Sequence, residues 1–133
     1  MKTIKITLIV ISQLALISCN DDTKESTKKY SEISFTRNKI DIGEVKLGTS
    51  KEVIFYAKNR SDAPLIIDSV KSSCSCTVSK FPKHPILKND SGIIIAKYTP
   101  NATNVGTLSK SVVVLSNTKP AFNVLTFYGN VIP

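Results

Sequence analysis

Residues 52–58 read Glu-Val-Ile-Phe-Tyr-Ala-Lys, and this short segment decides the fold class. Val53, Phe55 and Ala57 occupy every second position, so on an extended backbone their side chains would share one face. A helix needs apolar residues three and four positions apart, a spacing that no window longer than a few residues keeps. The segment therefore predicts a β-strand that buries one face in a core.

Similar short runs, rich in Val, Ile and Thr and bounded by turn-forming residues, follow one another along the chain. They are Ile33–Thr36, Lys39–Val45, Leu65–Lys71, Ile93–Tyr98, Leu108–Ser116 and Phe122–Ile132, with Thr77–Phe81 as a candidate for an extra edge piece. Val112–Leu115 is apolar on both faces, which indicates a central strand. About seven strands in ~100 residues predict an all-β, immunoglobulin-like sandwich.

Two of these runs are candidates for exposed sheet edges, Ile33–Thr36 and Phe122–Ile132. The second run carries no charged residue, although edge strands usually carry charges that prevent aggregation. It is either an open edge that a partner covers by strand addition, or a central strand paired on both sides. Its apolar residues favour the central position, and both alternatives stay open.

The charge pattern bears on possible partners. The chain has a formal net charge of +8, from 18 Lys and Arg against 10 Asp and Glu. The basic residues form no run, and Arg37 and Arg60 are the only arginines. Phosphate recognition favours clustered arginines, so we expect a mildly basic, solvated surface and no nucleic-acid partner.

The N-terminus has the parts of an export signal. Lys2 and Lys5 precede a mostly apolar run, Ile6–Ile17, of roughly 18 Å if helical, which is too short for a ~30 Å bilayer core. The run ends in Leu16-Ile17-Ser18-Cys19, which resembles the bacterial lipobox. That resemblance implies cleavage before Cys19 and a lipid on its thiol.

The predicted domain organisation follows from this signal. Residues 1–18 form a lipoprotein signal peptide, and residues 19–32 form a lipidated, charged and flexible tether. Residues 33–133 form the sandwich domain. We expect the lipid to anchor the protein to the outer membrane of the cell envelope, on the periplasmic face or at the cell surface.

Several landmarks in the body resemble a known family. Ile40–Val45 is similar to its opening Asp-Phe-Gly strand, Lys58–Leu65 to its Asn-x-Gly-x-x-Pro-Leu corner, and Ser73–Thr77 to its Ser-Cys-Gly-Cys-Thr motif. These residues resemble domain-of-unknown-function family 1573, immunoglobulin-like lipoproteins common in Bacteroidetes. The family looks like a distant relative of the PapD pilus-chaperone and sperm-protein sandwiches. The resemblance implies fold and location, while Ser75 departs from its usual Gly.

Cys74 and Cys76 form the one chemically suggestive cluster. On a straight strand, residues i and i+2 lie roughly 6.6 Å apart, so a disulfide between them requires a bend at Ser75. Three interpretations remain: a structural pair, bonded or reduced; a soft-metal site for copper or zinc with His84 as a third ligand; or a redox-active dithiol. We expect the structural role, with no cofactor or tightly bound metal.

Other catalytic arrangements lack the residues they need. His84 is the single histidine, no Gly-x-Ser-x-Gly precedes it, and no Gly-rich phosphate loop is present. Strict strand alternation would place Asp41 and Glu44 on opposite faces, apart from each other. The sequence therefore predicts a non-enzymatic binding or scaffolding module for an envelope protein or a glycan. The alternative is a copper-binding or redox-active envelope protein that uses Cys74 and Cys76.

Overall fold

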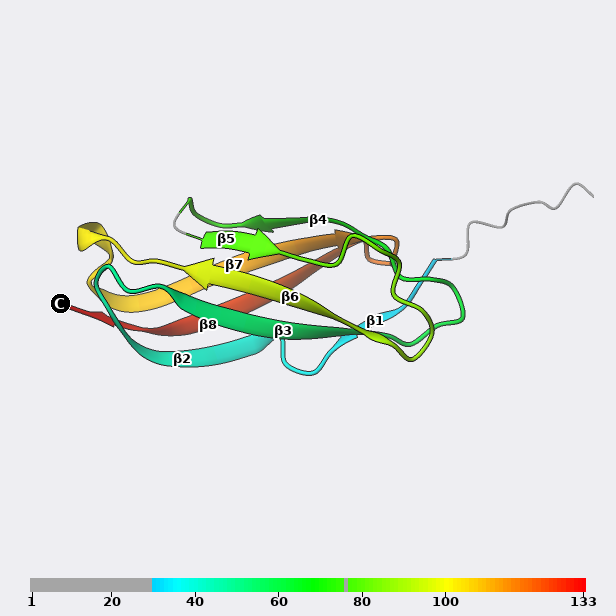
Figure 1. Ribbon diagram of the computed structural model, residues 1–133, viewed down its shortest axis with the longest axis horizontal. Helices are drawn as coiled ribbons and strands as arrows, with labels where there is room; N and C mark the ends of the chain where they lie inside the picture. The colour runs from blue at the N-terminus through cyan, green and yellow to red at the C-terminus, as the bar shows by residue number, and fades with distance from the viewer. Residues whose placement is uncertain (1–29, 76) are drawn as a thin grey trace, which may run out of the picture.

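The computed structural model describes residues 30–75 and 77–133, which form two packed β-sheets of four strands each (Figure 1). The strands are β1 (Ile33–Phe35), β2 (Lys39–Lys46), β3 (Lys51–Asn59), β4 (Ile67–Ser72), β5 (Thr77–Lys80), β6 (Ser91–Tyr98), β7 (Gly106–Ser116) and β8 (Phe122–Ile132). A short 3-10 turn, η2 (Ala102–Asn104), lies between β6 and β7.

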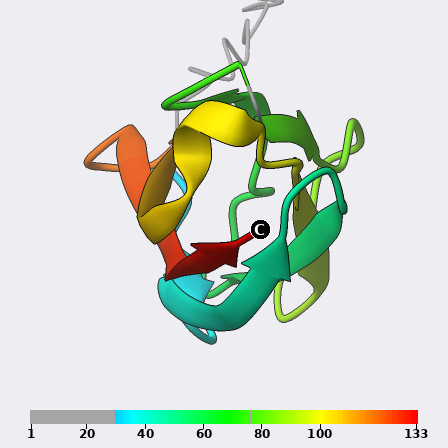
Figure 2. The same cartoon turned by 90° about the vertical axis from the view of Figure 1, so that its left-hand side faces the viewer.

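The strands divide into two sheets, which we call sheet I and sheet II. Sheet I has the order β1-β3-β6-β5, and sheet II has the order β2-β8-β7-β4. Pairing is antiparallel except between β2 and β8, which run parallel. Figure 2 looks onto the end where the chain terminates and shows the strands of both sheets surrounding the interior. The all-β, immunoglobulin-like sandwich predicted from the sequence is confirmed, with β5 as the extra edge piece.

The core forms between the two sheets. Val53, Phe55 and Ala57 of β3 are all buried, as their spacing predicts. Across the interface, the rings of Tyr98 on β6 and Phe127 on β8 pack with their centroids 5.7 Å apart. The sandwich therefore derives its stability from two apolar inner faces, a non-directional contribution that scales with the area removed from water.

Strand β8 lies in the middle of sheet II, paired with β7 on one side and β2 on the other. The hypothesis that Phe122–Ile132 is an exposed edge is therefore wrong, and the central alternative holds. Phe127 and Leu125 are fully buried, so this charge-free strand needs no protection against aggregation. The other candidate edge, at Ile33, is confirmed, because β1 is the first strand of sheet I.

A β-bulge interrupts the pairing of β2 with β8 between Asp41 and Gly43. Gly43 adopts a left-handed φ of 64°, and its N–H donates to Asp41 Oδ1 at 2.8 Å. The extra residue shifts the alternation, so Asp41 and Glu44 are both exposed while Ile42 and Val45 are both buried. Their predicted placement on opposite faces is corrected accordingly.

A buried polar corner follows the end of β3. Asn59 is fully buried, and its amide donates to the carbonyl oxygens of Ala63 at 2.8 Å and Ile86 at 2.9 Å. Its Oδ1 accepts hydrogen bonds from the backbone N–H of Ser61 and from the hydroxyl of Ser31. The Asn of the corner motif thus holds three separate segments together.

The N-terminal predictions fall mostly outside the described residues. The signal peptide (residues 1–18), Cys19 and most of the tether lie there, so they stay predictions. Ser31, assigned to the tether from its composition, is buried and donates its N–H to the Asn117 carbonyl at 2.9 Å. The packed structure therefore includes Ser31, before the first strand begins at Ile33.

Candidate binding edge on strand β3

Strand β3 has one side that its neighbour covers only in part. On that side β1 pairs with residues 57–59 alone, through the registers Ile33↔Asn59 and Phe35↔Ala57. The last contact is a hydrogen bond from the Thr36 N–H to the Tyr56 carbonyl at 3.3 Å. The chain then leaves for β2, which belongs to the other sheet. Between Lys51 and Tyr56, no described strand pairs with this side of β3.

Two hydrogen bonds establish which backbone groups point to this side. The Asn59 N–H reaches toward β6, where the Asp90 carbonyl accepts it, whereas the Tyr56 carbonyl points toward β1. Successive residues in a strand present their N–H and C=O to opposite sides. Ile54 and Glu52 therefore point both groups the same way as Tyr56. These groups have no partner in the described part of the chain, and they form what we call the free edge.

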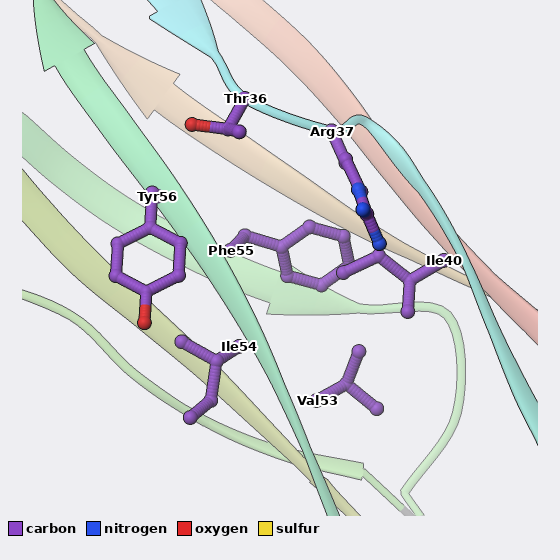
Figure 3. Close-up of a pocket in the computed structure, with 7 residues that line it drawn as sticks. All are labelled: Thr36, Arg37, Ile40, Val53, Ile54, Phe55 and Tyr56. Carbon is purple, nitrogen blue, oxygen red and sulfur yellow. The ribbon is translucent and has the colours of Figure 1, made fainter.

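A groove runs beside the free edge (Figure 3). Its volume is about 410 Å³, and it is lined by Thr36, Arg37, Ile40, Val53, Ile54, Phe55 and Tyr56. The lining comes from β3, from the β1–β2 connection and from the start of β2, so the groove opens at the sandwich side where the two sheets meet. Figure 3 shows the Arg37 side chain extending from the connection toward Ile40 and Phe55.

An apolar patch lies on the outer face of sheet I next to the free edge. Ile54 pairs across the strands with Ile95, and Tyr56 pairs with Ile93. Ile54, Tyr56 and Ile93 are 41%, 48% and 47% exposed. We call Ile54, Tyr56, Ile93 and Ile95 the outer patch. Clustered exposed apolar side chains beside an unpaired edge are a feature of interaction surfaces.

The edge of β2 across the groove is blocked, in contrast to the free edge. Its bulge at Gly43 distorts the hydrogen-bonding pattern, and the Lys51 ammonium donates to the Ile42 carbonyl. Bulges and lysines are common means of protecting a sheet edge. Strand β3 has no bulge in its pairing with β6, and Glu52 is the single charged side chain among its free-edge residues.

The structure separates the other predicted site residues. Cys74 lies in the β4–β5 connection and is disulfide-bonded, while Cys76 lies outside the described residues. His84 is exposed in the β5–β6 connection, beyond the opposite end of β5. The four residues of β5 alone span roughly 13 Å, so Cys74 and His84 are not brought together.

Residues 30–75 and 77–133, which the structure describes, also bear on metal binding and on membrane spanning. Within them, no three His, Cys, Asp or Glu side chains are placed to hold a metal ion together. The same residues include no helix with the length and apolarity to cross a membrane. The soft-metal interpretation also needs Cys76, which lies outside the described residues, so it stays an alternative.

Comparison with known families agrees with the architecture. Residues 33–131 match the family model described as a protein of unknown function, DUF1573. The chain belongs to the DUF1573 family. Among curated proteins, no sequence matches this DUF1573 chain.

Solved structures show the same fold at low sequence identity. A protein of unknown function from Porphyromonas gingivalis W83 superposes with a TM-score of 0.69 at 11% identity. The match covers 83% of the DUF1573 chain and 51% of that protein, so the chain spans about half of its length. The ASH/PapD-like domain 7 of human CEP192 superposes with a TM-score of 0.63 at 11% identity. This match covers 87% of the DUF1573 chain and 96% of the CEP192 domain.

Sequence reasoning did not find the free edge. The Glu52–Lys58 segment was correctly predicted as a half-buried strand, but the candidate edges named from the sequence were Ile33–Thr36 and Phe122–Ile132 and did not include it. A signal was present in the outward positions of the strand, where Ile54 and Tyr56 stand in place of the polar residues expected on a solvated face.

Proposed function

We propose that this DUF1573 domain is a non-enzymatic binding module of the cell envelope, which captures an extended segment of a partner protein by strand addition to β3. One observation carries the proposal. The backbone groups of Glu52 and Ile54 face outward with no partner among the described residues, beside a groove and an apolar patch. An added strand would pair with them and cover the apolar surface.

The chemistry of the edge favours a polypeptide over a glycan. Unpaired N–H and C=O groups on a strand are matched by the regular spacing of another extended chain. Side chains of the added strand would alternate between the groove and the outer patch, which gives a means of selecting sequence. Tyr56 is the only aromatic residue of the outer patch, which offers little surface for stacking sugar rings.

The proposed anchor places this module at a membrane. A lipid on Cys19 and the charged segment that follows would hold the sandwich close to the outer membrane while leaving it free to reorient. The partner would then be another envelope protein. The tether and the free edge are different segments of the chain, so the domain could be anchored and bind a partner at the same time.

Ile54→Pro in the full-length, tagged protein tests the proposal. Proline removes the outward N–H of residue 54, which the β6 pairing does not use, so the fold should tolerate it as edge strands do. Ile54→Thr is the matched control, because it loses similar apolar surface and keeps the N–H. We expect affinity purification from envelope extracts to recover partners with wild type and Ile54→Thr, but at strongly reduced yield with Ile54→Pro.

Circular dichroism and protease resistance establish that each variant is folded. If Ile54→Pro does not fold, Glu52→Pro is used in its place, because it removes the outward N–H of residue 52. A folded proline variant that recovers the same partners at undiminished yield would show that recognition lies elsewhere on the domain.

A further inference from the structure

We infer that the captured segment carries a carboxylate side chain, Asp or Glu, which enters the groove and pairs with Arg37. This inference rests on the proposed strand addition and specifies the chemistry of the partner. It is carried by the position of the Arg37 side chain and by the charges on the groove side of β3.

Arg37 is a cation at the mouth of an otherwise largely apolar groove. It follows Thr36, the last residue that pairs with β3, and its side chain extends toward Ile40 and Phe55 (Figure 3). No carboxylate in the described part of the chain pairs with it. A guanidinium binds carboxylates through two parallel hydrogen bonds, and covering the groove would exclude the water that now solvates it.

A second cation lies on the same side of β3, just beyond the residues that line the groove. Lys51 shares the inward-facing side of β3 with Val53 and Phe55, and its ammonium donates to the Ile42 carbonyl of β2. Glu52, the nearby acid, is exposed on the other face of the strand. The groove side of the free edge thus offers two cations and no anion from β3, which favours an acidic segment over a basic one.

The same charges disfavour a second copy of this chain as the occupant. Two β3 edges paired in antiparallel fashion around Ile54 would bring Lys51 of one copy toward Arg37 of the other. Both contacts of the symmetric pair would then be between like charges, with no carboxylate on the groove side to offset them. Like charges placed together across an interface weaken it and act as a filter against the wrong partner.

Strand alternation defines the sequence pattern of the segment. Side chains of an added strand point in turn into the groove and over the outer patch. The acidic residue therefore occupies a groove-facing position near Phe55, the end of the free edge closest to Arg37. Its neighbours on either side face outward over Ile54 and Tyr56, where apolar or β-branched residues fit best.

Selection from a phage-displayed library of random twelve-residue peptides tests the inference on the full chain in detergent. We expect peptides selected on wild type to be enriched in Asp or Glu flanked by apolar residues. Glu→Gln in such a peptide, or Arg37→Gln in the protein, should each weaken binding about ten-fold, as expected for a charge-assisted hydrogen-bonded pair. Lys39→Gln, which removes a neighbouring exposed cation from β2, should leave affinity nearly unchanged.

Three results separate this inference from the proposed function. Some peptides could lose binding to Ile54→Pro and still bind Arg37→Gln as tightly as wild type. That result would overturn the carboxylate inference and leave strand addition standing. Equal losses from Arg37→Gln and Lys39→Gln would also overturn it, because they indicate general attraction to positive charge. A selection that yields no peptide sensitive to Ile54→Pro would overturn both.

Discussion

The side-chain amide of Asn59 donates to the carbonyl oxygen of Ile86 at 2.9 Å, which joins the end of β3 to the connection that leads into β6. Asn59 is fully buried and Ile86 is nearly so, so this bond is shielded from solvent. The same amide also satisfies the Ala63 carbonyl, so one side chain supports two loop segments. Asn59 is therefore the centre of the corner next to the covered part of β3, where the Ser31 and Ser61 hydroxyls also donate to the Ala63 carbonyl.

Asn59→Ala should destabilise the domain by about 3 kcal/mol, because it removes several buried hydrogen bonds at once. The measurement is the free energy of unfolding in urea. Asn130→Ala, on the exposed face of β8, is the control and should change it by less than about 0.5 kcal/mol. Similar values for the two variants would contradict the role assigned to the corner.

Gly129→Ala should be more destabilising than Gly43→Ala. A Cβ at position 129 would lie 2.3 Å from the Gly43 carbonyl oxygen, so the paired backbones of β2 and β8 must separate, at about 2–3 kcal/mol. A Cβ at position 43 meets no atom within 4 Å, and only the left-handed φ opposes it, at about 1 kcal/mol. Urea unfolding of both variants measures the order, and a reversed order would refute the close approach.

Tyr98 predicts a loss of stability at high pH. Burial raises the pKa of its hydroxyl above the usual value near 10. As pH rises past 10, the unfolded chain releases this proton before the folded chain does, so the free energy of unfolding falls. Tyr98→Phe should lack this part of the decline, which is measured as the difference between the two proteins across pH 9 to about 11.

At neutral pH, Tyr98→Phe should leave stability within about 1 kcal/mol of wild type or raise it slightly. The buried hydroxyl has no hydrogen-bond partner among the described residues, so its removal sacrifices no such bond there. A large destabilisation would show that this hydroxyl has an essential partner.

Cys19→Ala should release the protein from membranes. The lipobox-like Leu16-Ile17-Ser18-Cys19 predicts that the mature chain begins at an acylated Cys19. Mass spectrometry of the wild-type N-terminus should find the lipid, and fractionation should move the variant into the soluble envelope fraction. A wild-type N-terminus elsewhere, unaffected by the substitution, would end the lipoprotein prediction.

Protein purified from the envelope should contain copper and zinc at well below one equivalent. Cys74 is disulfide-bonded, and a disulfide sulfur is not the thiolate that binds these metals. His84, the only imidazole in the chain, lies beyond the other end of β5. Elemental analysis that finds one equivalent of metal, absent from both Cys74→Ser and His84→Ala, would establish the copper or redox alternative instead.

The sequence alone determined the fold class and the inward residues of most strands. Alternation at Val53, Phe55 and Ala57 depends only on the local two-residue period of an extended chain, so it can be interpreted without knowledge of any partner strand. The local part of the corner at Asn59 lies within the sequence motif, but the bulge at Gly43 was not predicted, and the contacts of Asn59 with Ile86 and Ser31 join distant segments.

Only the tertiary structure decided which strands have open sides. Strand β8 pairs with its sequence neighbour β7 and also with β2, which lies far away in the sequence, and no local pattern encodes that second pairing. The free edge of β3 exists because β1 is short and the chain crosses to the other sheet after Thr36, which leaves Glu52 and Ile54 without a neighbour. A strand's own residues specify its faces, whereas its edges are determined by where the rest of the chain goes.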